Sequence, residues 1–539
     1  MQSMKKYASA LILVLIVLAG AGLRVANLDR TSLWVDEANT VFTAQALNET
    51  GVDTLPSGHI YGRARVYTAI VAASFRIFGV SEASARLPSA LFGVLSILLV
   101  YGLARIFFGP KTAFVTACFM TFSHFEVGWS RTARMYTLLQ FMTLWLTFAF
   151  LKTFPEADAR SPRNRWVDFL SFPWLAVLLV TFAVTAVHIH SLIAMLVPAF
   201  GLAMLVRAIR IALNGTERSR WLNAYTVLLV GGVMAGAALL AVLPGLRQTM
   251  LESFTYTPGW AEGSAFAARK TALLEFLLSP WRMPITVFAF LGGFQLITRK
   301  HVRGWLPGIL FLAPFILLSL TFTHRVEAYL FFVYPFFLMI AAFGLVNWLD
   351  AEYERLPFIQ RIGVQENRLI VIGMVLLMFV LFPWLRITLN IPRTPDGVTN
   401  MAVTPVEWRG ASRTVLSNKH PDDVVITSLP QVALYYGLES DYMLNQANLE
   451  QAESKGLVNA QGQRTDLYAG VRCVESLDML KSIIAEHASG WLLVSNHHFT
   501  HPQYVPEPVR EYIEKRFGPP QTTPQGTVRI YRWMDGGTG

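Results

Sequence analysis

The chain has 539 residues, of which 53% are hydrophobic and 15% charged, and its mean hydropathy is +0.43. Soluble proteins carry about 25% charged residues, so this composition excludes an ordinary soluble enzyme. The net charge of +10 does not form a basic stripe on a soluble domain, which argues against a nucleic-acid partner. It fits positive cytoplasmic loops and anion sites in a protein whose partner is the lipid bilayer.

The N-terminus carries Lys5 and Lys6 before the apolar run LILVLIVLAGAGL, which continues to about Ala26 without a convincing cleavage site. We interpret this run as an uncleaved first helix and not as a signal peptide. A spanning helix needs about 20 mostly apolar residues. By that measure the sequence predicts about eleven spans, centred near residues 17, 98, 119, 144, 179, 200, 234, 285, 313, 338 and 378.

Basic residues gather in alternate connections between these spans, which marks those connections as cytoplasmic. The N-terminus is then cytoplasmic and, with an odd number of spans, the C-terminal region is extracytoplasmic. The basic residues are Lys5, Lys6, Arg105, Lys111, Lys152, Arg160, Arg163, Arg165, Arg207, Arg210, Arg218, Arg220, Arg299, Lys300, Arg303, Arg355, Arg361 and Arg368. The segments predicted to face outward hold the most unusual polar residues, and they are 28–87, 124–134, 188–190, 246–270 and 323–327.

The first outer loop, residues 28–87, is long enough to be functional. In its second half Val66, Ile70, Ala73 and Ile77 recur at helical spacing. This pattern predicts an amphipathic helix that lies in the membrane interface without spanning the bilayer.

The composition becomes polar and mixed from about Thr388. Here VVITSL and WLLVS predict buried strands, ESLDMLKSIIAEHA predicts a capped helix, and TVRIYRW predicts an edge strand. The expected fold class is therefore a polytopic α-helical membrane protein with a C-terminal extracytoplasmic α/β domain. We place a transmembrane domain at residues 1–388 and the α/β domain at residues 389–539.

The sharpest polar motif is Trp34-Val35-Asp36-Glu37, directly after the first span. Two adjacent carboxylates at a bilayer surface repel each other and lose hydration there, both of which cost free energy. Their presence therefore suggests a specific role. A sugar transfer to a hydroxyl needs one carboxylate to accept the proton, whereas a phosphate leaving group needs no general acid. The simpler alternative is that Asp36 and Glu37 only cap the next helix.

Arginines lie at two further outer entrances to spans. Arg131 and Arg134 precede Tyr136, and His324 and Arg325 precede Glu327 and Tyr329. The planar guanidinium pairs phosphate in a bidentate way, so both groups are candidates to hold a lipid phosphate. The alternatives are side chains that reach lipid head-groups and a weak Arg325–Glu327 surface pair.

Weaker candidates complete the set. His188 and His190 could bind a metal, but without a clear third ligand they are more simply interfacial histidines, so we predict no metal site and leave a metal requirement open. Soluble-enzyme motifs such as GxGxxG, the P-loop, HExxH and GxSxG are absent. No cofactor is expected.

Taken together, these residues resemble the GT-C superfamily of membrane glycosyltransferases. The chain looks most like the dolichyl-phosphate-mannose protein mannosyltransferases and the lipid A aminoarabinose transferases. The resemblance covers roughly residues 7–350 and the outer domain more loosely. It rests on the 34–37 motif, on FRIFGVSEASARLPSALFGVLSILLVYGLAR at 75–105, on the 131–136 segment, and on HRVEAYLFFVYPFFLMIAAFG at 324–344.

The resemblance implies an inverting transfer of a sugar from a polyprenyl-phosphate donor to an acceptor hydroxyl of a glycan, lipid or protein. Asp36 would be the base with Glu37 beside it, and the four cationic residues would hold the donor phosphate. Many relatives carry paired prolines and tyrosines near residues 58–62, where this chain has no proline, which puts the role of His59 in doubt. The remaining candidates for substrate contacts are His59, Tyr61, Tyr136, Tyr256, Trp260 and Tyr329.

Two other functions remain open at this point. A transporter or flippase of lipid-linked sugars would need polar residues at mid-bilayer depth and broken helices in matched halves. A non-enzymatic membrane scaffold would not need Asp36. Transfer of a whole lipid-linked oligosaccharide would use the same scaffold as the proposed enzyme.

Overall fold

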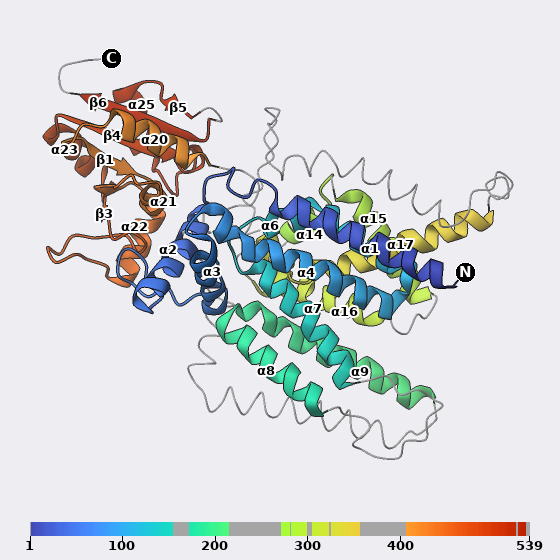
Figure 1. The fold of residues 1–539 in the computed structure, drawn as a ribbon. Coiled ribbons are helices and arrows are strands. Elements are labelled where there is room, and N and C mark those ends of the chain that lie inside the picture. Colours follow the sequence, from blue (N-terminus) through green and yellow to red (C-terminus); the bar gives the residue numbers. More distant parts are fainter. Residues whose placement is uncertain are drawn as a thin grey trace.

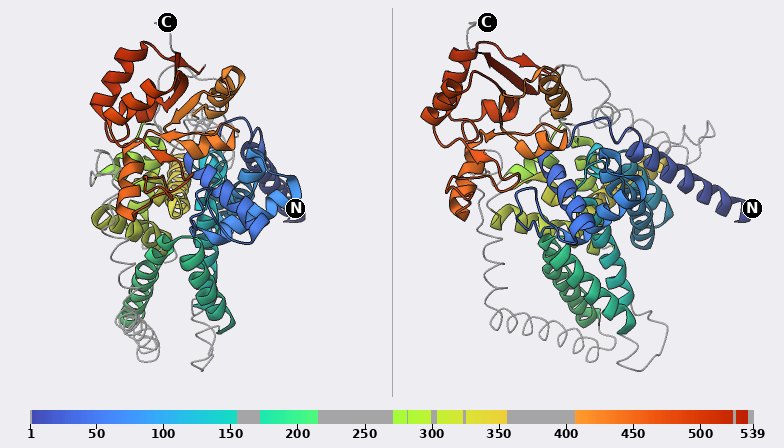
Figure 2. Two further views of the ribbon diagram at one scale, coloured as in Figure 1. Left: turned by 90° about the vertical axis from the view of Figure 1, so that its left-hand side faces the viewer. Right: turned by 60° about the vertical axis from the view of Figure 1, so that its left-hand side comes forward.

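The computed structural model describes residues 2–154, 172–214, 271–280, 282–298, 304–322, 325–355, 406–523 and 526–534. Helices up to residue 355 form a bundle, and residues from 406 onward form a separate lobe at one end of it (Figures 1 and 2). The long helices of the bundle are α1 (Gln2–Val25), α4 (Glu82–Phe108), α5 (Pro110–Phe122), α7 (Tyr136–Thr153), α8 (Phe172–His188), α9 (Leu196–Asn214), α15 (Met283–Thr298), α16 (Trp305–Thr321) and α17 (Tyr334–Arg355).

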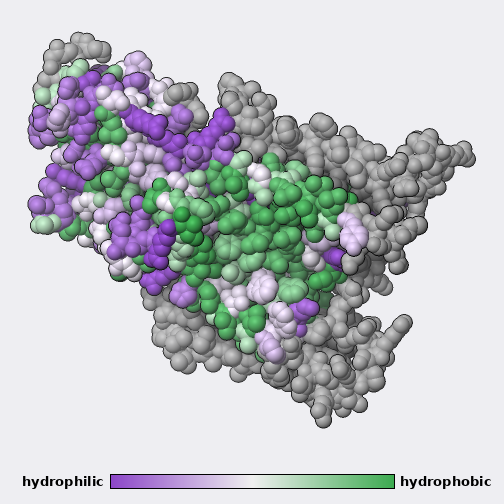
Figure 3. All heavy atoms as spheres, viewed as in Figure 1, coloured by the Kyte–Doolittle hydropathy of each residue, from purple (hydrophilic) through white to green (hydrophobic). Residues whose placement is uncertain are grey.

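Every expected span centre that lies in the described residues falls inside one of these helices. The centres near 234 and 378 lie outside the described residues. Among the described helices, α4 and α17 are long and apolar enough to cross a membrane, and several others are shorter and apolar. Hydrophobic residues also cover the visible face of the bundle, whereas the C-terminal lobe is mostly hydrophilic (Figure 3).

Short elements connect the long helices at the end of the bundle that carries the lobe. The first outer loop forms α2 (Val35–Thr50) and α3 (Arg65–Phe78). Helix α3 buries Tyr67, Val71 and Phe75. Of the stripe noted in the sequence, Val66 and Ile70 are partly buried against the core, while Ala73 and Ile77 are exposed. The remaining short helices are α6 (His124–Ser130), η2 (Ser191–Met195), α14 (Ala272–Leu277) and η3 (Glu327–Leu330).

The lobe contains one six-stranded sheet with the strand order β3-β2-β1-β4-β6-β5. The first four strands in this order are parallel, and β6 is antiparallel to both β4 and β5. The strands are β1 (Val424–Thr427), β2 (Tyr442–Met443), β3 (Arg472–Cys473), β4 (Ser489–Ser495), β5 (Gln521–Thr522) and β6 (Val528–Met534). The helices are α20 (Trp408–Asn418), α21 (Pro430–Tyr435), α22 (Gln446–Lys455), α23 (Leu477–Glu486), α24 (Asn496–Thr500) and α25 (Glu507–Phe517).

The sheet is buried on both faces, which explains why its central strands are continuously apolar. Ile426 and Leu492 point into the core under α23 and α25, and Val425 and Leu493 point into the core under α20 and α21. The TVRIYRW segment was expected at an edge. This expectation is wrong, because β6 lies between β4 and β5 and the two-residue β5 forms the edge.

Helix α2 joins the lobe to the bundle. Its residues Val35, Ala38 and Phe42 belong to the same apolar cluster as Trp408 and Val432 of the lobe. Polar contacts support this packing. Arg409 Nη2 lies 2.5 Å from Glu82 Oε1 of α4 and 2.6 Å from the carbonyl oxygen of Asp29. The start of the first outer loop is therefore enclosed between the lobe and the membrane helices.

Two glycines allow α15 and α17 to pack with their backbones in contact. A Cβ atom at Gly292 would overlap the carbonyl oxygen of Ile340, and one at Gly344 would overlap that of Phe288. Small residues at such crossings let membrane helices approach closely.

We expect Gly292→Leu to lower the midpoint of thermal unfolding of the detergent-purified protein by several degrees, because overpacking costs about 1–3 kcal/mol. Gly293→Leu is the matched control, since a Cβ atom at Gly293 meets nothing within 4 Å. Equal midpoints for the two variants would contradict the close crossing.

Candidate active site

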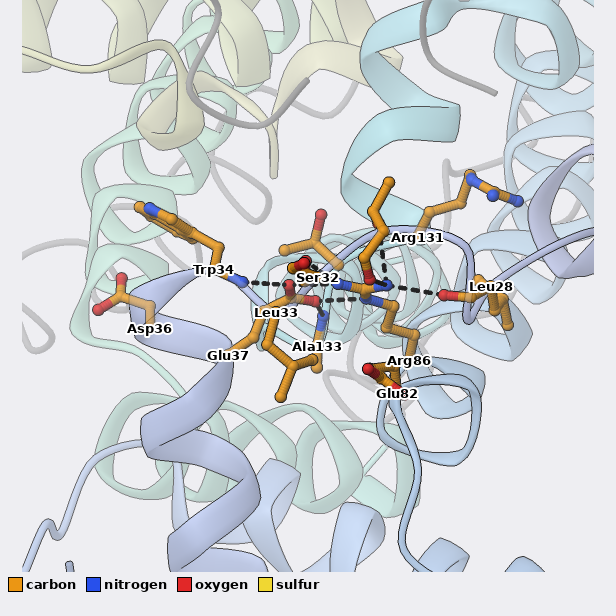
Figure 4. Close-up of polar contacts among 12 residues, drawn as sticks. Leu28, Ser32, Leu33, Trp34, Asp36, Glu37, Glu82, Arg86, Arg131 and Ala133 are labelled. Carbon is orange, nitrogen blue, oxygen red and sulfur yellow. Dashed lines mark hydrogen bonds and ion pairs between the residues drawn. The ribbon is translucent and has the colours of Figure 1, made fainter. Parts of the chain in front are cut away.

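The site begins at the first turn of α2, where the two adjacent acidic residues diverge. Successive residues of an α-helix point about 100° apart, so Asp36 and Glu37 cannot face the same partners. Glu37 points into the protein and is 3% exposed, whereas the Asp36 side chain is 33% exposed. Figure 4 shows the Asp36 carboxylate pointing away from the contacts of Glu37.

Glu37 accepts four hydrogen bonds. Arg86 of α4 donates from Nε to Oε1 at 2.8 Å and from Nη2 to Oε2 at 2.7 Å. The backbone N–H groups of Trp34 and Ala133 donate at 3.0 and 2.7 Å. Burial alone would raise the pKa of Glu37, but the charge and hydrogen bonds of Arg86 and the two N–H groups hold it below its ordinary value. Glu37 is thus a fully engaged carboxylate that fixes the start of α2.

Asp36 forms an ion pair with Arg134, which lies in the turn between α6 and α7. Arg134 Nη2 is 3.3 Å from Asp36 Oδ2. Its Nη1 donates to the Tyr61 hydroxyl and to the Asp36 carbonyl oxygen, both at 3.4 Å. Arg134 Nε is buried and has no hydrogen-bond partner among the described residues, which leaves one donor of the guanidinium unused.

Arg131 does not share this position, although the sequence grouped it with Arg134. Its guanidinium donates to the carbonyl oxygens of Leu23, Arg24, Ala26 and Asn27 at 2.5–3.3 Å. These carbonyls end helix α1 and have no partner within the helix. Arg131 thus satisfies the C-terminus of the first span, and its charge is directed at α1 and not at Asp36.

Three tyrosines predicted from the sequence lie close to Arg134. Tyr61 and Tyr136 are both hydrogen-bonded to it. Tyr329 of η3 is connected through His190, whose ring centroid lies 5.9 Å from that of Tyr136 and 6.4 Å from that of Tyr329. Segments from four distant parts of the chain therefore surround one carboxylate and one guanidinium.

Sequence reasoning did not propose Arg63 or Tyr468 for the site, and it considered His190 only as a possible metal ligand. The Arg63 guanidinium lies 6.0 Å from the Tyr61 ring centroid. Burial and then the charges of Arg134 and Arg63 lower the pKa of His190 to about 4, so its ring is neutral near pH 7, and its Nδ1 accepts from Leu192 N at 3.2 Å. Tyr468, from the lobe, interacts electrostatically with Asp36. No local pattern marks Tyr468, because it reaches the site only through the docking of the lobe.

The other predicted substrate residues differ in their placement. His59 is exposed, and only its backbone makes hydrogen bonds in the described part of the chain. Arg325 is 6% exposed and donates from Nε to the Ser319 carbonyl oxygen at 2.9 Å. His324, Tyr256 and Trp260 lie outside the described residues.

No group of three or more His, Cys, Asp or Glu side chains is arranged to hold a metal within the described residues. His188 and His190 do not form such a group, since His190 Nδ1 is already hydrogen-bonded to the backbone. The chemical groups at the site are therefore one open carboxylate, two arginines and several phenols. They can accept a proton and bind an anion.

The chain is similar to known proteins in part of its sequence and in its fold. Residues 63–214 match the model of the family described as Dolichyl-phosphate-mannose-protein mannosyltransferase. The solved structure of ArnT from Cupriavidus metallidurans, including its form bound to undecaprenyl phosphate, is similar with a TM-score of 0.58 at 13% identity, over 97% of this chain and 98% of that one. The chain has the GT-C fold.

A second similar structure is the archaeal oligosaccharyltransferase AglB from Archaeoglobus fulgidus, in complex with an inhibitory peptide and a dolichol-phosphate. Its TM-score is 0.57 at 11% identity, over 98% of this chain and 74% of that one. Comparison with curated protein sequences gave no significant match. The similarity in fold confirms the GT-C resemblance stated from the sequence.

We expect Glu37→Gln to destabilise the protein by about 3–5 kcal/mol, because it leaves Arg86 buried without its counter-charge. Since the pKa of Glu37 is lowered on folding, its contribution is present above the ordinary value of 4.5 and is lost as the pH falls through the lowered pKa. The wild type should therefore lose thermal stability on acidification below pH 4.5 more steeply than Glu37→Gln.

The control for this experiment is Glu49→Gln, on the exposed end of the same helix. It should change neither the unfolding midpoint at neutral pH nor its dependence on pH. A Glu37→Gln protein as stable as this control would show that the buried pair does not hold α2.

Proposed function

We propose that this protein transfers a sugar from a polyprenyl-phosphate donor to an acceptor hydroxyl, with Asp36 as the general base. The observation that carries the proposal is the division between the two acidic residues. Glu37 is occupied by four donors, while Asp36 is partly exposed and lies against Arg134. A base must be able to reach its substrate, and only Asp36 of this pair can.

In the proposed reaction the acceptor oxygen attacks C1 of the donor sugar on the face opposite the phosphate. Asp36 takes the hydroxyl proton as the new C1–O bond forms. The bond between C1 and the phosphate oxygen breaks, and its electron pair leaves with the polyprenyl phosphate. No general acid is needed, because the phosphate leaves as a stable anion. The anomeric configuration is inverted.

Arg134 is proposed to hold the donor phosphate, with Arg63 as a second cation. Arg134 carries the unused Nε donor, and both arginines lower the pKa of His190, so the two charges act on one region. A guanidinium that also contacts Asp36 would keep the developing phosphate charge close to the base. His324 and Arg325 remain proposed donor contacts, and Tyr61, Tyr136 and Tyr329 remain proposed substrate contacts. His59, Tyr256 and Trp260 are further proposed substrate contacts.

We base the proposed topology on the Lys and Arg residues in the connections between the spans. The N-terminus would be cytoplasmic, and the 28–87 loop and the lobe at 389–539 would be extracytoplasmic. The packing of α2 against the lobe supports a common side for Asp36 and the lobe. A hexose and a pentose both fit this mechanism. Acceptors could be glycan, lipid or protein hydroxyls.

We expect Asp36→Asn to lower kcat for sugar transfer by about 10²–10⁴-fold, the usual contribution of a general base. Purified protein would be supplied with radiolabelled polyprenyl-phosphate sugars, and label would be followed in acceptor and free sugar. The matched control, Asp29→Asn, changes an exposed outer carboxylate and should retain wild-type activity. Transfer that survives Asp36→Asn at the wild-type rate would remove Asp36 from the mechanism.

A second experiment separates the two arginines. We expect Arg134→Gln to raise KM for the donor at least about tenfold, since a hydrogen bond to a charged group is worth about 1.5–3 kcal/mol. Arg131→Gln should instead lower the unfolding midpoint, because the carbonyl oxygens of residues 23, 24, 26 and 27, at and just beyond the end of α1, lose this donor. If folded Arg134→Gln and folded Arg131→Gln have the same KM for the donor, the assignment of the donor phosphate to Arg134 is wrong.

A further inference from the structure

One turn of the lobe, residues 466–471, lies on the first outer loop far from the α2 contact. Ser57 Oγ donates to the Leu467 carbonyl oxygen at 2.5 Å, and Ser57 N donates to the Tyr468 carbonyl oxygen at 3.2 Å. Gly470 has a φ of +74°, and a Cβ atom placed on it would lie 3.2 Å from Ser57 Cα. The two segments are therefore in direct backbone contact, which leaves little room for larger residues.

The turn is held rigid from inside by Asp466, which is 1% exposed. Its carboxylate accepts from the N–H groups of Tyr468, Ala469 and Val471 at 2.8, 3.0 and 2.8 Å. A carboxylate that binds three amides of one turn holds the backbone of that turn in place. The direction of the Tyr468 side chain is thus set by the lobe itself.

The Tyr468 phenol interacts electrostatically with three residues of the candidate active site, Asp36, Tyr61 and Arg63. Burial raises the pKa of its phenol, the charges of Asp36 and Tyr61 raise it further, and Arg63 opposes them. Its hydroxyl is also hydrogen-bonded to Gln451 of α22. Tyr468 and Tyr61 therefore supply two aromatic side chains next to Arg63 and the exposed side of Asp36.

We propose that the Asp466–Val471 turn forms one wall of the acceptor subsite and that Tyr468 positions a sugar hydroxyl beside Asp36. This inference rests on the function proposed above and adds the class of acceptor. An aromatic ring with a polar tip can pack against the apolar face of a sugar and hydrogen-bond one of its hydroxyls. Tyr468 is a positioning residue, because the proton goes to Asp36.

The test compares Tyr468→Ala with Tyr468→Phe and with the control Tyr512→Ala, on α25 of the same lobe. The probe acceptor is n-octyl β-D-glucopyranoside, with the full-length protein in nanodiscs and a labelled donor. Transfer to the glucoside is measured together with free sugar released by transfer to water. Unfolding midpoints of all variants are recorded, so that loss of folding is recognised.

For Tyr468→Ala we expect KM for the glucoside to rise at least about tenfold, since a misplaced acceptor costs up to about 10²-fold. Donor KM and the release of free sugar should stay within twofold of wild type, because Arg134 is untouched. Tyr468→Phe keeps the ring, so its KM for the glucoside should lie between those of the wild type and Tyr468→Ala. Tyr512→Ala should behave as wild type. An unchanged glucoside KM in folded Tyr468→Ala protein would overturn the inference while leaving the proposed function intact.

The wild type separates the remaining outcomes. If it consumes no polyprenyl-phosphate sugar under any condition, the proposed function fails, and the acceptor assignment fails with it. If it releases free sugar but never labels the glucoside, only the assignment of a sugar acceptor is overturned.

Discussion

The buried ion pair between Glu37 and Arg86 is the interaction on which the candidate site depends. It joins the start of α2 to the start of α4, and the Ala133 N–H adds the turn that carries Arg134. A carboxylate with 3% exposure is tolerated only because four donors replace its water. Because neighbouring residues of a helix point in different directions, Asp36 faces away from these donors once Glu37 faces them. The hydrogen bonds of Glu37 therefore determine where Asp36 lies.

Arginines perform a similar structural task elsewhere around this end of the bundle. Arg24 is fully buried and donates to Ser130 and to the carbonyl oxygens of Gly20, Met120 and Thr121. Arg131 satisfies the end of α1. These cations bind backbone oxygens that the bilayer could not hydrate. The arginines at the outer end therefore have two roles. Arg24 and Arg131 bind backbone oxygens of the helices, whereas Arg134 and Arg63 lie near the partly exposed carboxylate of Asp36.

The lobe has two attachments to the first outer loop, and together they enclose the site. One is the apolar packing of α2 beneath α20 and α21, with Arg409 on Glu82, and the other is the 466–471 turn on Ser57. The first attachment includes α2, which carries Asp36, and the second lies at Ser57, so the loop is held to the lobe at both places. This arrangement explains how a residue of a separate lobe comes to interact with a carboxylate that follows the first span.

The sequence by itself determined the helical spans inside the described residues, the apolar strands of the lobe, and the acidic and arginine motifs, because periodicity and composition are local properties. It could not decide which of two adjacent carboxylates is buried, or that Arg131 binds α1 while Arg134 meets Asp36. These outcomes depend on partners such as Arg86, 49 residues from Glu37, and Tyr468 of the lobe. Only tertiary packing brings such distant groups together, so only the structure could assign one carboxylate to the scaffold and leave the other open.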